Sequence, residues 1–387
     1  MSLGISIYFG LDNTRKENMN LMKKAYDLGY KRIFTSLHIP EANYKVLKSE
    51  VSEFLKEAKK LNMDIISDIS PNTFKFLGLE DMDLKGLKDM GIGTIRIDFG
   101  YTDEEIAKMS RNNYGIKIQM NASTLTKDLI YNLKKAKTDF SNIDALHNFY
   151  PRIGTGISRE CMIKMNKLLI NNNLKVCAFV QSNNKKRGPI KEGLPTLEDH
   201  RNMDIQLAAE ELYALGCDDI FIGDSLPSDD ELSLLANVKK NILDKNKDLF
   251  YFKNCQNNKS ELNNISNYNL NKEVILRIEV LTKDDTSLRL LKETYTSRID
   301  EARDFIRTQE SRLLLNGDKI EEEFSCERKL GDVTLDNIGY ARYMGELEII
   351  LRDSPKDKRI NTVARVKKED IYLLKKLTGG KKFKFEF

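Results

Sequence analysis

The chain has 387 residues, more than one hydrophobic core usually supports, so it is expected to fold as two or three domains. Hydrophobic residues make up 40% of the chain, which is enough for large buried cores and excludes a disordered protein. The 63 basic and 59 acidic side chains nearly cancel, so no strong overall field favours nucleic acid or a membrane as a partner.

The rarer residues narrow the possibilities further. With only three histidines, a centre built from several imidazoles is close to excluded, and we expect neither a metal nor another cofactor. The five cysteines include no Cys-x-x-Cys pair, which predicts reduced, structural thiols. A strand pattern starts at Leu3, where a signal peptide would have a basic segment and an apolar stretch, so we expect a cytoplasmic protein.

The first 248 residues alternate short β-branched runs with amphipathic segments, as repeated βα units do. The predicted helix over residues 43–61 carries its apolar side chains on one face, and Gly29 is placed to end the helix before the second strand. Eight strands are predicted, at Leu3–Phe9, Arg32–Leu37, Asp64–Ile69, Thr94–Phe99, Ile116–Met120, Ile143–Asn148, Lys175–Val180 and Asp219–Ile222.

Eight βα units in about 250 residues predict a (β/α)₈ TIM barrel, of the α/β class. The alternative is an open, doubly wound sheet. That fold places a Gly-x-Gly-x-x-Gly turn after its first strand, and this turn is missing here. Gly91 and Gly93 are no substitute, because they precede a strand and do not open a helix.

The composition changes after the predicted barrel, which is assigned to residues 1–248. Residues 249–271 are rich in Asn, Lys and Ser and predict a linker or irregular entry into a second domain. Residues 272–387 predict a small β-rich domain with a helix at Lys368–Leu377 and a second around Thr296–Ile306. Its strands are predicted at Val274–Leu281, Gly331–Leu335, Glu346–Leu351, Asn361–Val366 and Lys382–Phe387.

Polar side chains are expected at the C-terminal ends of the barrel strands, where such barrels build their active sites. Two structural alternatives stay open: Arg96 pairing with Asp98 on the same strand face, and Asp68 capping the next helix. The convergence of acids, amides and an imidazole favours a site, with Asp68 and Asp98 as a carboxylate pair suited to cleaving a glycosidic bond. The binding candidates at these ends are Glu41, Arg96, Asn121, His147, Asn148, Tyr150 and Asp224.

A long polar segment follows the seventh strand, and it contains Arg187 and, farther on, Arg201. Because barrels often bind phosphate near strands seven and eight, both arginines are candidates for gripping an anion; the alternative is a solvated basic loop. Glu198 is a reserve catalytic carboxylate, and His200 a candidate for substrate contact. All three histidines, His38, His147 and His200, lie on the predicted rim.

Several motifs together resemble the bacterial 6-phospho-N-acetylmuramidase family. They are Leu3-Gly-Ile-Ser-Ile-Tyr, Arg96-Ile-Asp-Phe-Gly, His147-Asn-Phe-Tyr-Pro, Gly193-Leu-Pro-Thr-Leu-Glu-Asp-His-Arg201 and Gly345-Glu-Leu-Glu-Ile-Ile. The resemblance implies a TIM barrel followed by a cyclophilin-like β domain. It also implies hydrolysis of the disaccharide of 6-phosphorylated N-acetylmuramic acid and N-acetylglucosamine in peptidoglycan recycling.

Under this hypothesis one of Asp68 and Asp98 is the acid, and the other is a nucleophile, a base or the stabiliser of an oxazoline. The amides and His147 would hold hydroxyl or acetamido groups, and Arg96, Arg187 and Arg201 would meet the phosphate or the lactyl carboxylate. Two rivals remain. One is a non-catalytic sugar-phosphate-binding or regulatory protein. The other is a phosphosugar isomerase or aldolase, for which Lys117 is the nearest candidate for a Schiff base. For the C-terminal domain we expect packing against the barrel or formation of a homo-oligomer.

Overall fold

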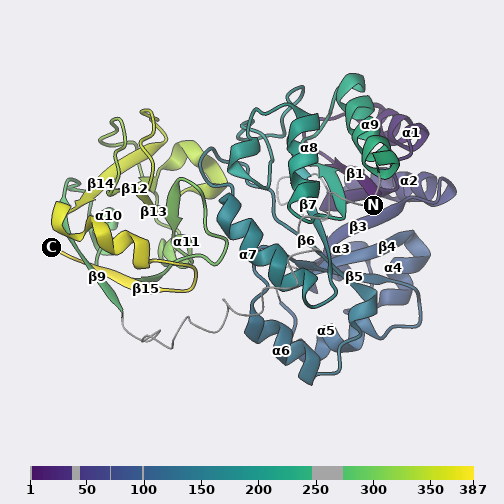
Figure 1. The fold of residues 1–387 in the computed structure, drawn as a ribbon, viewed down its shortest axis with the longest axis horizontal. Coiled ribbons are helices and arrows are strands. Elements are labelled where there is room, and N and C mark those ends of the chain that lie inside the picture. The colour runs from purple at the N-terminus through teal and green to yellow at the C-terminus, as the bar shows by residue number, and fades with distance from the viewer. Residues whose placement is uncertain (1, 37–43, 70, 98–99, 246–272) are drawn as a thin grey trace. The chain divides into compact units, whose positions relative to one another are not determined.

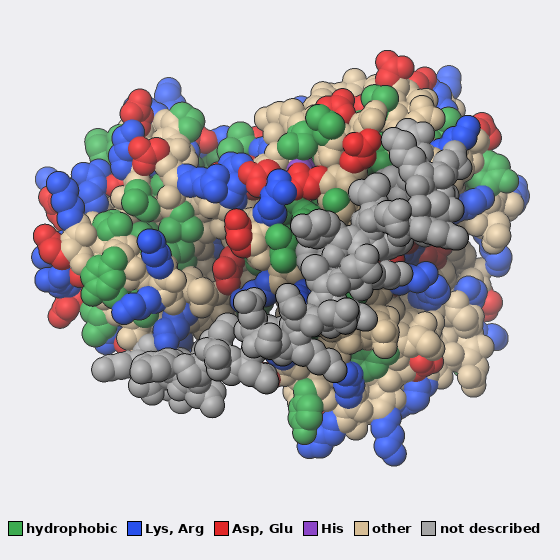
Figure 2. Space-filling view, viewed as in Figure 1, with side chains coloured by type: hydrophobic (Ala, Val, Ile, Leu, Met, Phe, Trp, Pro, Cys, Tyr) green, Lys and Arg blue, Asp and Glu red, His purple; other side chains and the backbone are tan. Residues whose placement is uncertain are grey.

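The structure is a computed structural model that describes residues 2–36, 44–69, 71–97, 100–245 and 273–387. The chain divides into two compact units, residues 1–257 and 258–387 (Figure 1). Among the described residues, no helix combines the length and the apolar character needed to cross a membrane. On the face shown in Figure 2, basic and acidic side chains are interspersed over both units, as the balanced composition predicts.

The first unit is a closed barrel of eight parallel strands in sequential order, which confirms the predicted fold class. Its strands are β1 Ser2–Ile7, β2 Arg32–Ser36, β3 Asp64–Ile69, β4 Ile92–Ile97, β5 Lys117–Asn121, β6 Ile143–Leu146, β7 Lys175–Val180 and β8 Asp219–Ile222. Its α-helices are α1 Arg15–Asp27, α2 Tyr44–Lys60, α3 Pro71–Leu77, α4 Leu84–Met90, α5 Asp103–Ser110, α6 Lys127–Lys135, α7 Arg159–Ile170, α8 Ile205–Ala214 and α9 Asp229–Lys245. Short 3₁₀ turns, η1 Phe140–Asn142 and η2 Glu198–His200, complete it.

Local sequence signals account for the helix boundaries. Thr14 caps the start of α1 in a capping box with Glu17, and the same Thr–Glu pattern starts α5. As predicted, Gly29 terminates α1: it lies two residues after the last helical residue, and its φ of 83° suits a residue without a Cβ. The amides of Gly29 and Tyr30 then donate to the carbonyls of Tyr26 and Ala25, which closes the helix with a Schellman motif.

The interior of the barrel is filled with side chains and is not a pore. Phe34 of β2, Phe179 of β7 and Phe221 of β8 form one cluster, with ring centroids 5.3 Å apart for Phe34 and Phe179 and 5.7 Å apart for Phe179 and Phe221. Phe149, just after β6, packs on Phe179 at 5.1 Å. Such edge-to-face and tilted contacts are the geometries that aromatic rings prefer.

Charged side chains close the N-terminal end of the barrel, which we call the floor. Arg32, the first residue of β2, lies 3.1 Å from Asp64, 2.9 Å from Asp144 and 3.0 Å from Asp219. These carboxylates come from the starts of β3, β6 and β8. Burial raises the pKa of Asp144, and the nearby Arg32 guanidinium opposes that shift.

The second unit is a curled, mixed sheet in the order β10-β15-β9-β14-β12-β13-β11, with β9 and β15 parallel and the other pairs antiparallel. Along β9, Val274, Leu276 and Ile278 alternate with exposed residues and face the core. The strands are β9 Val274–Val280, β10 Thr294–Thr296, β11 Phe305–Arg307, β12 Asp332–Asp336, β13 Leu347–Ile350, β14 Ile360–Val366 and β15 Lys382–Glu386. The helical elements are α10 Asp285–Leu290, α11 Ser311–Leu314, and the 3₁₀ segments η4 Ile338–Tyr343 and η5 Lys368–Lys376.

One predicted helix of this unit is wrong. Residues 296–306 form no helix, because the ends of this range belong to β10 and β11. Thr294 and Thr296 are β-branched, and Tyr295 is buried against Phe383 of β15, so pairing with β15 determines the conformation. Tertiary packing thus overrides the weak helical pattern.

Candidate functional site

The C-terminal ends of the strands form the mouth of the barrel, and three predicted site residues meet there. Arg96 of β4 lies in register with Asp68 of β3, and its Nη1 is 2.9 Å from the Asp68 carboxylate. The other terminal nitrogen of Arg96 donates to Asn148 Oδ1 at 2.6 Å. Arg96 is buried, whereas 27% of the Asp68 side chain is exposed, so the carboxylate remains accessible.

A hydrogen-bond chain behind the mouth holds Asn148. The backbone N–H of Asn148 donates to Ser123 Oγ at 2.9 Å, and Ser123 Oγ lies 3.1 Å from His147 Nδ1. His147 Nε2 lies 2.8 Å from Asn166 Oδ1, and the Asn166 side-chain amide donates to Leu215 O. Because Oδ1 of Asn166 must accept, His147 carries its proton on Nε2 and accepts from Ser123 at Nδ1.

Burial keeps this histidine neutral. The side chain of His147 has no exposed surface, and desolvation lowers its pKa from 6.5 to about 4, partly opposed by the hydrogen bond to Asn166. With both ring nitrogens held by protein groups, His147 faces the helix layer and does not face the mouth. Its geometry therefore suits support of Asn148, in contrast to the substrate contact expected from the sequence.

Arg187 lies at the mouth between two aromatic rings. Its guanidinium carbon is 4.7 Å from the centroid of Tyr8 and 4.8 Å from the centroid of Phe149. The residue is 9% exposed, and within the part of the chain that the structure describes its guanidinium has neither a hydrogen-bond partner at Nε nor an ion pair. Burying a cation without a carboxylate partner is unfavourable in free energy unless a ligand anion neutralises its charge.

The ring of Tyr8 lies near three charged side chains of the mouth, those of Arg187, Asp224 and Asp68. Its hydroxyl donates to Gly223 O at 2.7 Å. Burial raises the pKa of the phenol, Arg187 lowers it, and the charges of Asp224 and Asp68 raise it, so these three residues all lie near one ring. Tyr8 was not among the predicted site residues, although its position directly after β1 was the available signal.

Asp224 holds the loop that carries Arg187. Its buried carboxylate accepts the backbone amides of Ser182 at 3.0 Å, Arg187 at 3.0 Å and Leu194 at 3.2 Å. Burial raises the pKa of Asp224, and these hydrogen bonds oppose the shift. With both oxygens used by the backbone, Asp224 is placed to shape the loop and not to touch a substrate.

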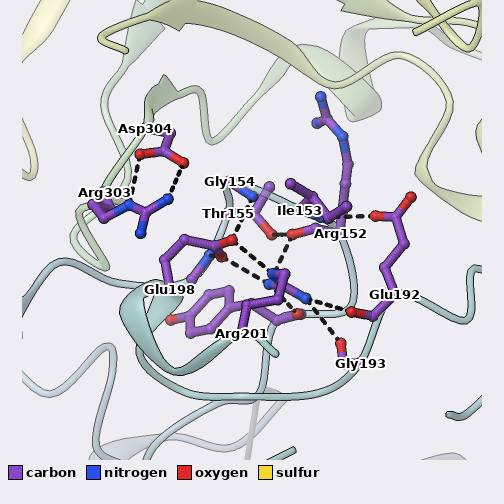
Figure 3. Close-up of polar contacts among 12 residues, drawn as sticks. Arg152, Ile153, Gly154, Thr155, Glu192, Gly193, Glu198, Arg201, Arg303 and Asp304 are labelled. Atoms are coloured by element: carbon purple, nitrogen blue, oxygen red, sulfur yellow. Dashed lines mark hydrogen bonds and ion pairs between the residues drawn. The ribbon is translucent and has the colours of Figure 1, made fainter. Parts of the chain in front are cut away.

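Glu198 and Arg201, in the segment that follows β7, form an ion pair that we call the clamp (Figure 3). Arg201 contacts the two carboxylate oxygens of Glu198 at 2.6 and 2.7 Å, and those oxygens also accept the amides of Gly154 and Gly156, both at 2.8 Å. The terminal nitrogens of Arg201 also donate to the backbone carbonyls of Glu192, Gly193, Tyr150 and Arg152.

This clamp engages two of the predicted site residues. The side chains of Glu198 and Arg201 are only 1% and 4% exposed, and each polar atom already has a protein partner. Catalysis by Glu198, or phosphate binding by Arg201, would require these hydrogen bonds to break. Both residues instead fix the chain around residues 150–156 to the segment that follows β7.

The remaining candidates are placed as follows. His200 is buried, and its Nε2 lies 3.0 Å from Glu211 of α8; desolvation lowers its pKa, with Glu211 opposing. Asn121 is buried beside a cavity of about 130 Å³ between the ends of β4 and β5 and helices α5 and α6. Tyr150 is buried, and its amide donates to Pro195 O. Glu41, Asp98 and His38 lie outside the described residues.

The described residues include no group of three or more His, Cys, Asp or Glu side chains arranged to hold a metal ion. The strongest features of the mouth are thus the Asp68 carboxylate, oriented by Arg96, and the Arg187 cation, which no described carboxylate neutralises. Together they suit acid–base or nucleophilic chemistry next to an anionic group.

Models of known protein families match most of the chain. The model of the N-terminal domain of 6-phospho-N-acetylmuramidase matches residues 3–237, and the model of its C-terminal domain matches residues 274–386. The chain belongs to the 6-phospho-N-acetylmuramidase family. The resemblance seen in the motifs is thereby confirmed, and the family is one of glycosidases.

Two solved structures share the whole architecture. A conserved protein of unknown function from Enterococcus faecalis is 32% identical, with coverage of 100% of this chain and 96% of that one and a TM-score of 0.56. An uncharacterized B. cereus protein is 27% identical, with coverage of 100% of this chain and 99% of that one and a TM-score of 0.53. A search of the curated proteins gave no match.

Proposed function

We propose that this family member is an active glycoside hydrolase acting on the disaccharide of 6-phosphorylated N-acetylmuramic acid and N-acetylglucosamine. Water adds across the glycosidic C–O bond, and free N-acetylglucosamine leaves. The observation that carries the proposal is the buried Arg187, which forms no ion pair with any described residue, at the mouth that also presents Asp68. Recycling of cell-wall fragments in the cytoplasm is the role that this substrate implies.

The proposed roles follow from the contacts. Arg187 binds the phosphate, and Asn148 and Asn121 hold acetamido or hydroxyl groups. Arg96 orients Asp68 and does not itself bind the phosphate, because it is engaged by Asp68 and Asn148. An ion pair favours the ionised form of a carboxylate, so Asp68 is the nucleophile, base or oxazoline stabiliser.

Asp98 is then the proton donor to the leaving sugar. It follows β4 in the sequence, one residue beyond the end of the strand. A general acid must be protonated when the substrate binds, and this role is left to Asp98 once Asp68 is ionised. The two carboxylates thereby take different roles, as glycoside hydrolysis requires.

Incubation of the protein with the phosphorylated disaccharide tests this function. We expect release of N-acetylglucosamine by the wild type and a large loss of release in Asp68→Asn. Binding without release identifies the non-catalytic rival, and conversion of a phosphosugar without release identifies an isomerase or aldolase. The geometry gives no support to a Lys117 Schiff base, because Lys117 is exposed at the first position of β5, at the floor end.

A further inference from the structure

The loop that carries Arg187 is anchored at two consecutive backbone amides. The Arg187 amide donates to Asp224 Oδ1 at 3.0 Å, and the Gly188 amide donates to Asp12 Oδ2 at 2.7 Å. Asp224 follows β8 and Asp12 follows β1, so the anchors come from two different strand ends. The peptide carrying the guanidinium is therefore fixed from both sides.

Asp12 makes a second hydrogen bond besides the one to the Gly188 amide. Its Oδ2 also accepts the Ser225 hydroxyl at 3.1 Å, which ties the loops after β1 and β8 together. A Cβ at position 188 would lie 2.9 Å from Asp12 Oδ1, so glycine at this position allows the carboxylate to approach the backbone. The hydrogen bond is charge-assisted and short, which makes it stronger than an ordinary amide–carbonyl bond.

We propose that Asp12 is a positioning residue that holds Arg187 in its anion-binding orientation between Tyr8 and Phe149. The inference rests on the proposed role of Arg187 as the ligand of the phosphate. Arg187 has no carboxylate partner within the described residues to fix its guanidinium, so the rings and the backbone anchors determine where the cation points. Preorganisation of this kind raises affinity because less side-chain and loop freedom is lost on binding.

The carboxylate of Asp12 also has an opposite effect, since a negative charge near the site repels an anion. Two variants separate the effects. Asp12→Ala removes both the acceptor and the charge, whereas Asp12→Asn keeps an acceptor oxygen for the Gly188 amide and removes only the charge. Positioning and repulsion therefore predict different orders of affinity.

Isothermal titration calorimetry with N-acetylmuramic acid 6-phosphate and the full chain measures the affinities of the wild type and of both variants. We expect Asp12→Ala to bind roughly tenfold more weakly than the wild type, as loss of one charge-assisted hydrogen bond predicts, and Asp12→Asn to restore most of the affinity. Thermal unfolding of both variants is compared in parallel, so that a folding defect is recognised. In turnover assays, Asp12→Ala should raise KM for the phosphorylated disaccharide while leaving kcat within about threefold.

Equal tightening in both variants, or wild-type affinity in Asp12→Ala, overturns the positioning role. Absence of binding by the wild type overturns it as well. If the wild type binds the phosphosugar through Arg187 and Asp12 but releases no N-acetylglucosamine, the positioning role stands and the proposed hydrolysis fails. Binding and turnover are thus separate readouts of the two claims.

Discussion

Each end of the barrel contains a buried arginine, and the two arginines differ in whether described carboxylates neutralise their charge. At the floor, Arg32 is paired with three carboxylates at 2.9 to 3.1 Å. At the mouth, Arg187 is 9% exposed, stacked between Tyr8 and Phe149, and forms no ion pair with any described residue. The charge of Arg32 is neutralised by carboxylates of the folded chain. The charge of Arg187 is not neutralised by any described carboxylate, so a ligand anion can pair with it.

The difference shows how a TIM barrel separates stability from function. Side chains at the N-terminal ends of the strands close the fold, and those at the C-terminal ends are free to vary with the chemistry. Mutations at the two ends should accordingly change different quantities. Floor variants should change the free energy of unfolding, and mouth variants should change turnover or affinity.

The largest effect is expected for Asp68→Asn. Loss of the carboxylate that Arg96 orients should lower kcat for the phosphorylated disaccharide by roughly 10² to 10⁴-fold while the fold is kept. Steady-state kinetics and circular dichroism measure the two properties. Asp128→Asn, a change of the same kind at an exposed position on α6, serves as the control and should leave kcat unchanged. Near-wild-type turnover in Asp68→Asn would exclude Asp68 from the chemistry.

Arg32→Met should have the next largest effect, and on stability. It leaves Asp64, Asp144 and Asp219 without the cation that they share, so the free energy of unfolding should fall by about 3 to 5 kcal/mol. Urea unfolding measures the change. Arg187→Met provides the matched comparison at the mouth and should change stability by less than about 1 kcal/mol, because only stacking is lost. A floor variant as stable as the wild type would contradict the comparison.

A smaller, pH-dependent effect is expected from His147. Its pKa in the folded protein is about 4, below the value of 6.5 for an exposed imidazole, so the unfolded chain binds more protons between these values. The stability that His147 contributes is therefore complete above pH 6.5 and is lost as the pH falls toward 4.

His147→Gln removes this titration. The loss of unfolding free energy between pH 7 and pH 5 should be smaller in the variant than in the wild type by about 2 kcal/mol. Urea unfolding at both pH values measures it, and contributions from other titrating groups cancel in the difference. An identical pH dependence in the two proteins would mean that His147 is not buried in its neutral form.

The barrel was predictable because β-branched runs alternate with capped amphipathic helices, a pattern set by local sequence. The position of Asp68 and Arg96 at the mouth followed from their places at the ends of strands. The partners of Glu198, Arg201, His147 and His200 did not follow, because they depend on how distant segments meet. Glu198, for example, accepts amides from residues 154 and 156, more than forty positions away.

The central claim is that the mouth of the barrel binds a phosphorylated sugar through Arg187. It is tested most directly by kcat/KM for the phosphorylated disaccharide and for the same disaccharide without phosphate, measured in the wild type and in Arg187→Met. The account predicts a loss of about ten- to hundredfold for the phosphorylated substrate and little change for the other, because one charge-assisted contact to the phosphate is removed. Equal losses on both substrates, or no loss on either, would contradict it.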